Sequence, residues 1–123
     1  MRRLSILAVP VLIGFSSGAY AHPKLLSATP AQNATVAAPA RIELHFSERL
    51  IPQFSGADVM MTAHGGTAHA PMKMDSTAAL GEDGRTLVIT PRSALRAGRY
   101  SVSWHVVSAD THRITGNYAF TVR

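Results

Sequence analysis

The chain has 123 residues, a formal net charge of +5 and no cysteine. This length suits one domain with its own hydrophobic core and is too short for two. The basic residues are scattered and form no run interleaved with aromatic side chains, which argues against nucleic acid binding. No disulfide can staple the fold, so its stability must come from the core alone.

The first 21 residues have the pattern of a secretory signal peptide. Two arginines precede an apolar run from Leu4 to Phe15, and small residues follow, ending in Ala-Tyr-Ala. The run is shorter than the ~20 residues that a membrane-spanning helix needs. We therefore expect cleavage after Ala21, which leaves an exported domain of residues 22–123 that begins with His22. That domain keeps ten basic and seven acidic residues, a net charge of +3.

Beyond the leader, short runs alternate between apolar and polar residues, which is the period of half-buried strands. We expect a short strand near Leu25 and a loop up to Pro39, a loop at residues 63–76 where no period is visible, and a connection from Ser108 to Thr115. Further strands are predicted at residues 41–46, 56–62, 86–90, 99–107 and 117–122. With no convincing amphipathic helix, this pattern predicts an all-β fold, a Greek-key antiparallel sandwich or barrel of immunoglobulin-like type.

The alternation also predicts which side chains face the core. Tyr100, Val102, Trp104 and Val106 share one face of their strand and are expected inside. Met60 is expected in the core, with Met61 on the opposite face. His45 and His105 lie opposite the apolar faces of their strands, so we expect them to be exposed polar residues and do not count them as ligands.

A first group of candidate ligands combines the expected amino terminus with Asp110 and His112. The free amine and the imidazole of His22 can close a chelate ring on one metal ion, and Pro23 has no backbone N–H to offer instead. In extended backbone, residues two apart point to the same side, so Asp110 and His112 could face a common point. Three nitrogens and one oxygen in a plane suit Cu(II). Alternatively, Asp-Thr-His only closes the hydrogen bonds of a turn.

A second group begins at the end of the third predicted strand and continues through the predicted loop that follows it. The run from Met61 to Met74 holds three methionines and two histidines. Thioethers and imidazoles together favour Cu(I). Methionines that fill gaps in packing are the alternative reading of the same residues.

Taken together, these motifs make the mature chain similar to the CopC-type periplasmic copper-binding proteins of copper resistance. The resemblance covers essentially all of it and rests on the segments 22–25, 27–30, 42–48, 53–57, 88–91, 108–112 and 114–116. It implies a cupredoxin-like Greek-key barrel or sandwich of about seven strands, with separate Cu(II) and Cu(I) sites near opposite ends.

The resemblance also implies ligands and partners. The Cu(II) ligands carry over to His22, Asp110 and His112, with Glu48 as a carboxylate at or near that ion. The Cu(I) ligands carry over to Met61, His69 and Met72. This chain has His64 and Thr67 where methionine-rich members have methionine, so His64 and Met74 are further candidates for the Cu(I) site. A CopD-type inner-membrane copper transporter and a multicopper oxidase are the implied partners, and we expect a monomer.

Three functions fit the sequence. The first is a periplasmic carrier or buffer of copper in copper homeostasis and resistance, which is not an enzyme. The second is a copper-dependent oxygenase built on the amino-terminal histidine, although Asp110 would occupy the position that oxygen needs, and no flat aromatic face for a sugar is visible. The third is an immunoglobulin-like structural module without metal.

Overall fold

The computed structural model describes residues 22–123, and the predicted leader lies outside the described residues. No helix in the described part of the chain is long and apolar enough to cross a membrane. The elements in chain order are nine strands and one short 3-10 helix: β1 (Leu25–Thr29), β2 (Thr35–Val36), β3 (Ile42–Phe46), η1 (Pro52–Phe54), β4 (Gly56–His64), β5 (Thr67–Met74), β6 (Ser76–Leu80), β7 (Thr86–Pro91), β8 (Gly98–Val107) and β9 (Arg113–Val122).

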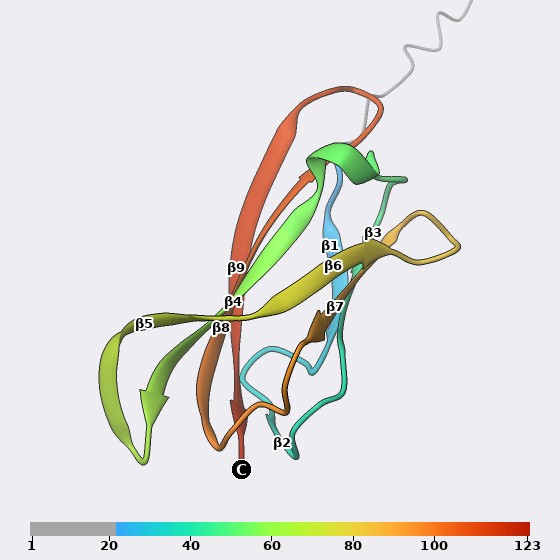
Figure 1. Cartoon of the computed structure of the whole chain (residues 1–123). Coiled ribbons are helices and arrows are strands. Elements are labelled where there is room, and N and C mark those ends of the chain that lie inside the picture. The colour runs from blue at the N-terminus through green and yellow to red at the C-terminus, as the bar shows by residue number, and fades with distance from the viewer. Residues whose placement is uncertain (1–21) are drawn as a thin grey trace, which may run out of the picture.

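The strands form two sheets that enclose the core (Figure 1). One sheet has the order β1-β3-β7-β6 and the other the order β2-β9-β8-β4-β5. All neighbours are antiparallel except β2, which runs parallel to β9. The predicted all-β sandwich is therefore confirmed. The start of the described chain, η1 and the β8–β9 connection lie at one end, and the turn between β4 and β5 lies at the other.

The core is built from the alternating runs of β3, β4, β7, β8 and β9. Tyr100, Val102, Trp104 and Val106 of β8 are all buried, as predicted. Phe46 packs edge-on against Trp104, with ring centroids 5.1 Å apart and planes at 73°. Phe46 belongs to β3 and Trp104 to β8, so this contact joins the two sheets, and such pairs of large aromatic rings add to the stabilisation from buried apolar area.

The predicted loop at residues 63–76 is wrong. β4 continues to His64, β5 covers Thr67–Met74, and β6 begins at Ser76. Gly65 and Gly66 form the turn with φ of 57° and 78°, the positive values that a two-residue hairpin turn requires. The strand was missed because β5 is a largely exposed edge strand, so its sequence shows no apolar alternation.

The inward face of β4 was also assigned wrongly. Met61 is buried, with 8% of its surface exposed, whereas Met60 is only half-buried. In the pairing of β4 with β8, Val59 lies opposite Val102 and Met61 lies opposite Tyr100. All four side chains are in the core.

Other differences concern strand ends. β9 begins at Arg113 rather than at residue 117, and β2 and β6 form where no strand was predicted. β2 has only two residues, and β6, Ser-Thr-Ala-Ala-Leu, has a single large apolar side chain. Neither segment is long or apolar enough to show a strand period in the sequence.

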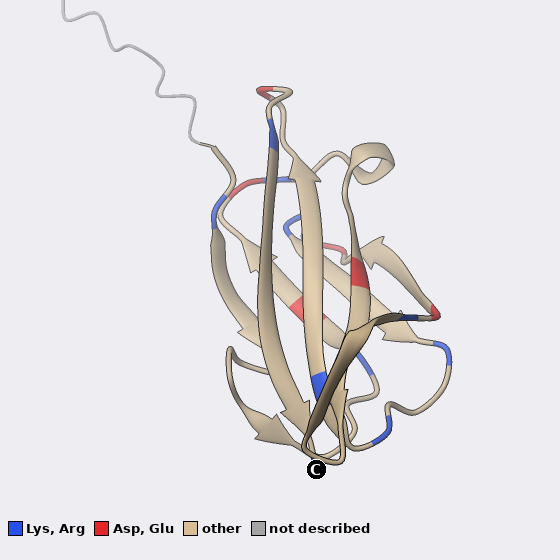
Figure 2. Ribbon diagram, turned by 90° about the vertical axis from the view of Figure 1, so that its left-hand side faces the viewer, with Lys and Arg blue, Asp and Glu red and all other residues tan. Residues whose placement is uncertain are grey.

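Charged residues are dispersed over the molecule, mostly at strand ends and in connections (Figure 2). Several are paired with the opposite charge, as Lys73 is with Asp58 at 3.2 Å and Arg92 with Asp75 at 3.0 Å. The described residues therefore present no concentrated basic face of the kind that binds nucleic acid.

The turn between β6 and β7 depends on Asp83. Its Oδ1 accepts hydrogen bonds from the backbone N–H groups of Arg85 (2.9 Å) and Thr86 (3.0 Å), and its Oδ2 accepts one from the Thr86 hydroxyl (2.7 Å). These bonds, first the one from Arg85, lower the pKa of Asp83 below its usual value of 3.8. A carboxylate whose pKa is lower in the fold stabilises the fold above its unfolded pKa and loses this effect as the pH falls through the folded pKa.

We expect Asp83→Asn to lower the melting temperature at pH 7 by several degrees, because the charged acceptor of three hydrogen bonds is lost. The difference from the unaltered protein should shrink below about pH 4, because the carboxyl becomes protonated first in the unfolded chain and only at lower pH in the fold. Thermal unfolding followed by circular dichroism from pH 7 to pH 2.5 measures both effects. Glu82→Gln, at the exposed neighbouring position, is the control, and an equal loss there would contradict the role given to Asp83.

Candidate metal centre

His22 is positioned by the residues that follow it. Pro23 is fully buried, so the chain is anchored directly after the histidine. The N–H of Lys24 donates to Oγ of Ser47 (2.9 Å), and the N–H of Ser47 donates to the carbonyl of Lys24 (2.9 Å). The imidazole itself is about half exposed, with 55% of the side chain accessible. His22 is therefore held at the surface by a fixed backbone.

Asp110 lies in the short connection between β8 and β9 and is turned inward. Only 7% of its side chain is exposed. Its Oδ1 accepts hydrogen bonds from the Ser108 hydroxyl (2.9 Å) and from the backbone N–H of His112 (3.2 Å). Ser108 is itself buried and its backbone is bridged to Leu50. One carboxylate oxygen is thus fixed by the loop, which leaves the other free for a different partner.

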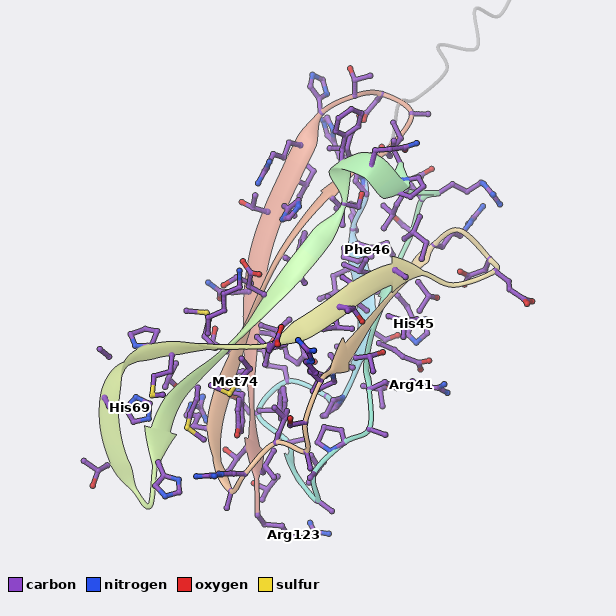
Figure 3. The ribbon with its side chains drawn as sticks, viewed as in Figure 1. Arg41, His45, Phe46, His69, Met74 and Arg123 are labelled. Carbon is purple, nitrogen blue, oxygen red and sulfur yellow. The ribbon has the colours of Figure 1, made fainter. Side chains whose placement is uncertain are left out.

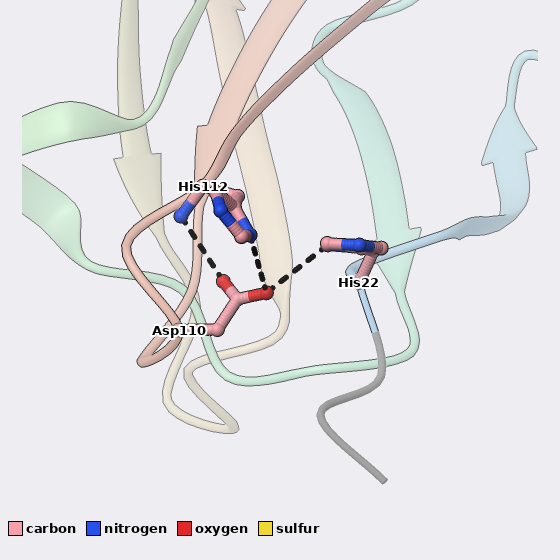
Figure 4. A group of neighbouring side chains, drawn as sticks. All are labelled: His22, Asp110 and His112. Carbon is pink, nitrogen blue, oxygen red and sulfur yellow. Dashed lines mark hydrogen bonds and ion pairs between the residues drawn. The ribbon is translucent and has the colours of Figure 1, made fainter.

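That other oxygen, Oδ2, faces two imidazoles (Figure 4). It lies 3.1 Å from Nδ1 of His22 and 3.5 Å from Nδ1 of His112. Neither contact has hydrogen-bond geometry, so Oδ2 is buried without a hydrogen-bond partner. A buried carboxylate oxygen without a partner is costly, and its position between two ring nitrogens is that of a ligand around a shared cation.

The distances fit one metal ion. Ligand atoms about 2.0–2.1 Å from a metal and at right angles to each other lie roughly 2.9 Å apart. The separations of 3.1 and 3.5 Å are close to this value. One ligand atom from each of the three residues lies within 4.8 Å of the other two. Among the residues that the structure describes, no other three His, Cys, Asp or Glu side chains bring their ligand atoms this close together.

The side chains converge for a reason other than the predicted one. Thr111 has φ of 66°, in the left-handed region, so residues 108–111 form a turn and not an extended strand. Its N–H donates to the carbonyl of Ser108 (2.9 Å), which closes that turn. A β-branched residue with positive φ is uncommon and costs on the order of 1–3 kcal/mol. This conformation of the loop brings the side chains of Asp110 and His112 close to each other.

Asp110 is held in its ionised form. The hydrogen bond from the Ser108 hydroxyl is the largest cause that lowers the pKa of this carboxyl, followed by the His112 N–H and the two nearby imidazoles, against the opposing effect of desolvation. The carboxylate is therefore charged at neutral and mildly acidic pH, as a metal ligand must be.

Glu48 is not a member of the group that contains His22, Asp110 and His112. It is half-buried and lies two residues before Leu50, the residue bridged to Ser108, so it belongs to the same end of the fold. His45 and His105 are half-buried on the outer faces of their sheets. His45 is engaged by Thr86 (Nδ1 to Oγ1, 2.9 Å).

At the other end, the structure brings three methionines together. Met61 of β4 lies directly opposite Met72 of β5, and Met74 is the next residue on the same face of β5. All three line a pocket of about 310 Å³, with Tyr100 and Leu95 also in its wall. Met61 is buried, Met74 is half-buried and Met72 is 56% exposed. The three thioether side chains therefore line one cavity but differ in how far they are exposed to solvent.

The two histidines of this hairpin lie outside that pocket wall. His69 and Met74 mark the two parts of β5 in Figure 3, His69 on the part that extends away from the body of the sandwich. Nδ1 of His64 is 3.0 Å from the carbonyl of Ala97, and Nδ1 of His69 is 2.7 Å from the carbonyl of Ala70. A carbonyl only accepts, so Nδ1 donates in both cases and Nε2 remains the nitrogen with a free lone pair.

Comparison with known proteins decides the family. The model of the CopC domain matches residues 25–123. The chain belongs to the CopC family. Copper resistance protein C of Pseudomonas syringae pv. tomato is 55% identical over 108 residues, 88% of this chain and 86% of that protein. Copper resistance protein C of Escherichia coli is 47% identical over 120 residues, 97% of this chain and 95% of that protein.

Solved structures of the CopC family have the same fold. The crystal structure of PcoC, a methionine-rich copper resistance protein from Escherichia coli, matches with a TM-score of 0.78 at 50% identity and covers 84% of this chain and 100% of that one. The crystal structure of CopC from Methylosinus trichosporium OB3b matches with a TM-score of 0.69 at 29% identity, over 82% and 93% of the two chains. The relatives from Pseudomonas syringae and Escherichia coli carry names of copper resistance, and none of the relatives named here carries the name of an oxygenase.

Proposed function

We propose that this CopC-family protein binds copper and serves in copper resistance, with His22, Asp110 and His112 as the protein ligands of Cu(II). The observation that carries the proposal is the buried Oδ2 of Asp110, which has no hydrogen-bond partner and lies 3.1 and 3.5 Å from two imidazole nitrogens. Imidazole nitrogen and carboxylate oxygen suit Cu(II) in a tetragonal plane.

Cleavage after Ala21 is part of the same proposal. It would give His22 a free amine as a fourth ligand atom and release the domain of residues 22–123 into the periplasm. Two features support this: the leader pattern of the first 21 residues, and the buried Pro23, which fixes the backbone beside the new terminus. There the protein would carry or buffer copper as a monomer and pass it to a CopD-type membrane transporter or a multicopper oxidase.

Copper content tests the proposed function directly. The processed protein, dialysed against a slight excess of Cu(II) and then against buffer, should retain about one copper per chain. The double variant Asp110→Asn with His112→Ala should retain almost none. Equal copper in both proteins would exclude this site, and no copper in the unaltered protein would exclude the function.

We further propose that the methionine pocket binds Cu(I) through Met61, Met72 and Nε2 of His69, with His64 and Met74 as further ligands from the hairpin. Thioethers are soft ligands and suit Cu(I). The two histidines do not line the pocket. The hairpin would therefore have to move so that their side chains reach the ion when it binds. The free Nε2 atoms are consistent with such a step.

The histidines make this Cu(I) site sensitive to pH. A thioether does not protonate between pH 5 and 8, whereas a free imidazole has a pKa of ~6.5, and protons compete with the metal for it. We expect Cu(I) affinity to fall as the pH goes from about 7.5 to about 5. A competition titration with a Cu(I) chelator at several pH values measures this slope.

Two variants separate the histidines. His64→Met should flatten the slope, and His69→Met should flatten it further, since each removes one proton-binding ligand. An unchanged slope in either variant would remove that histidine from the site, and a flat profile in the unaltered protein would remove both.

A further inference from the structure

Beside the candidate metal centre, the outer face of the β2-β9-β8-β4-β5 sheet is hollowed. One hollow of about 420 Å³ is lined by residues of η1, β8 and the β8–β9 connection, among them Phe54, Val107 and Thr111. A second hollow of about 390 Å³ continues along β8 and β9 past Ser103 and Asn117. His105 and Arg113 line both hollows, so together they form one groove, which we call the outer groove.

A glycine shapes the floor of the groove. Gly56 of β4 pairs with His105 of β8, and a Cβ atom at Gly56 would stand 3.2 Å from the His105 ring. The absence of a side chain at this position lets the imidazole lie across β4, so the groove depends on the local sequence of β4.

The groove has an apolar end and a basic middle. Phe54 is 61% exposed, one of the three most exposed large apolar side chains among the described residues, and lies at the end nearest the metal centre. Arg113 has no carboxylate within ion-pair distance in the described part of the chain. The acidic groups close by are already engaged, because Asp58 pairs with Lys73 at 3.2 Å and Asp110 is turned inward.

We propose that the outer groove binds an extended segment of a partner protein, with one apolar side chain against Phe54 and acidic side chains beside Arg113 and His105. Charge complementarity selects this occupant, since an unpaired guanidinium favours a carboxylate. Thr111 lines the groove and stands between Asp110 and His112, so the bound segment touches the loop that holds the candidate ligands. Docking itself does not need copper; a role in copper exchange rests on the proposed function.

The test is an NMR titration of the metal-free, ¹⁵N-labelled processed protein. The probe is a capped pentapeptide with a central phenylalanine flanked on each side by two aspartates. We expect saturable shifts at the amides of Phe54, His105, Thr111 and Arg113, with Kd below about 1 mM. A matched peptide with lysines in place of the aspartates should give none. Equal shifts with both peptides, or no saturable shifts, would overturn the proposal.

Variants locate the contact. Arg113→Glu should abolish the shifts and Phe54→Ser should weaken binding at least tenfold, while Arg92→Glu, outside the groove, should change nothing. Undiminished binding to Arg113→Glu would overturn the proposal. Phe54→Ser should retain copper like the unaltered protein, so a failure of docking and a failure of copper binding are distinguishable.

Discussion

A protein that keeps any residue before His22 is expected to bind Cu(II) far more weakly than the processed protein. An amide nitrogen replaces the free amine, and the chelate ring between this nitrogen and the imidazole is lost. Loss of an outer-shell partner of a metal ligand already costs about 10–100-fold in affinity, so we expect the loss of a ligand atom to cost more than that. Isothermal titration of Cu(II) against a competing chelator measures the difference.

The control for this experiment is an extension at the other terminus. The same residue added after Arg123, which is exposed, should leave Cu(II) affinity unchanged. Met61 of the methionine pocket pairs with Tyr100 near the start of β8, whereas Asp110 and His112 follow the end of that strand, so Cu(I) affinity should be the same in all three proteins. Equal Cu(II) affinity with and without the amino-terminal extension would exclude the amine as a ligand.

His112→Ala is expected to lower Cu(II) affinity by at least about 100-fold and to leave Cu(I) affinity unchanged. Met72→Ala is expected to do the reverse, because it removes one soft ligand at the far end of the fold. Both side chains are mostly exposed, so neither change should cost much stability. Competition titrations for each oxidation state measure the two affinities.

His105→Ala and Met60→Ala are the matched controls, since both residues are half-buried and lie outside the two candidate sites. They should leave both affinities unchanged. If either His112→Ala or Met72→Ala weakened the binding of both ions, one shared site would be the better description.

The sandwich could be predicted because its core strands alternate. In β3, Ile42, Leu44 and Phe46 are buried while the residues between them are not, and β8 repeats this pattern from Tyr100 to Val106. β5 could not be recognised in this way. It lies at the edge of its sheet, pairs only with β4, and contains Pro71, a residue type that is disfavoured in the middle of a strand and argues against a strand in the sequence. The Gly65-Gly66 pair was the available signal of the hairpin.

The candidate ligands could be proposed from residue type and spacing, but their geometry could not. Asp110 and His112 approach one another because Thr111 takes a left-handed conformation and Ser108 fixes one carboxylate oxygen, which spacing alone does not reveal. The opposition of Met61 and Met72 follows from the register of the β4–β5 hairpin. Register depends on turn type and bulges, so it became visible only in the structure.

Electron paramagnetic resonance of the processed protein with one equivalent of Cu(II) tests the central claim most directly. The account predicts a single tetragonal Cu(II) spectrum with coupling to several nitrogens, two from the imidazoles of His22 and His112 and one from the amine. His112→Ala should lose one nitrogen and shift the spectrum. A spectrum that is unchanged in His112→Ala, or one that equals the spectrum of Cu(II) in buffer, would contradict the account.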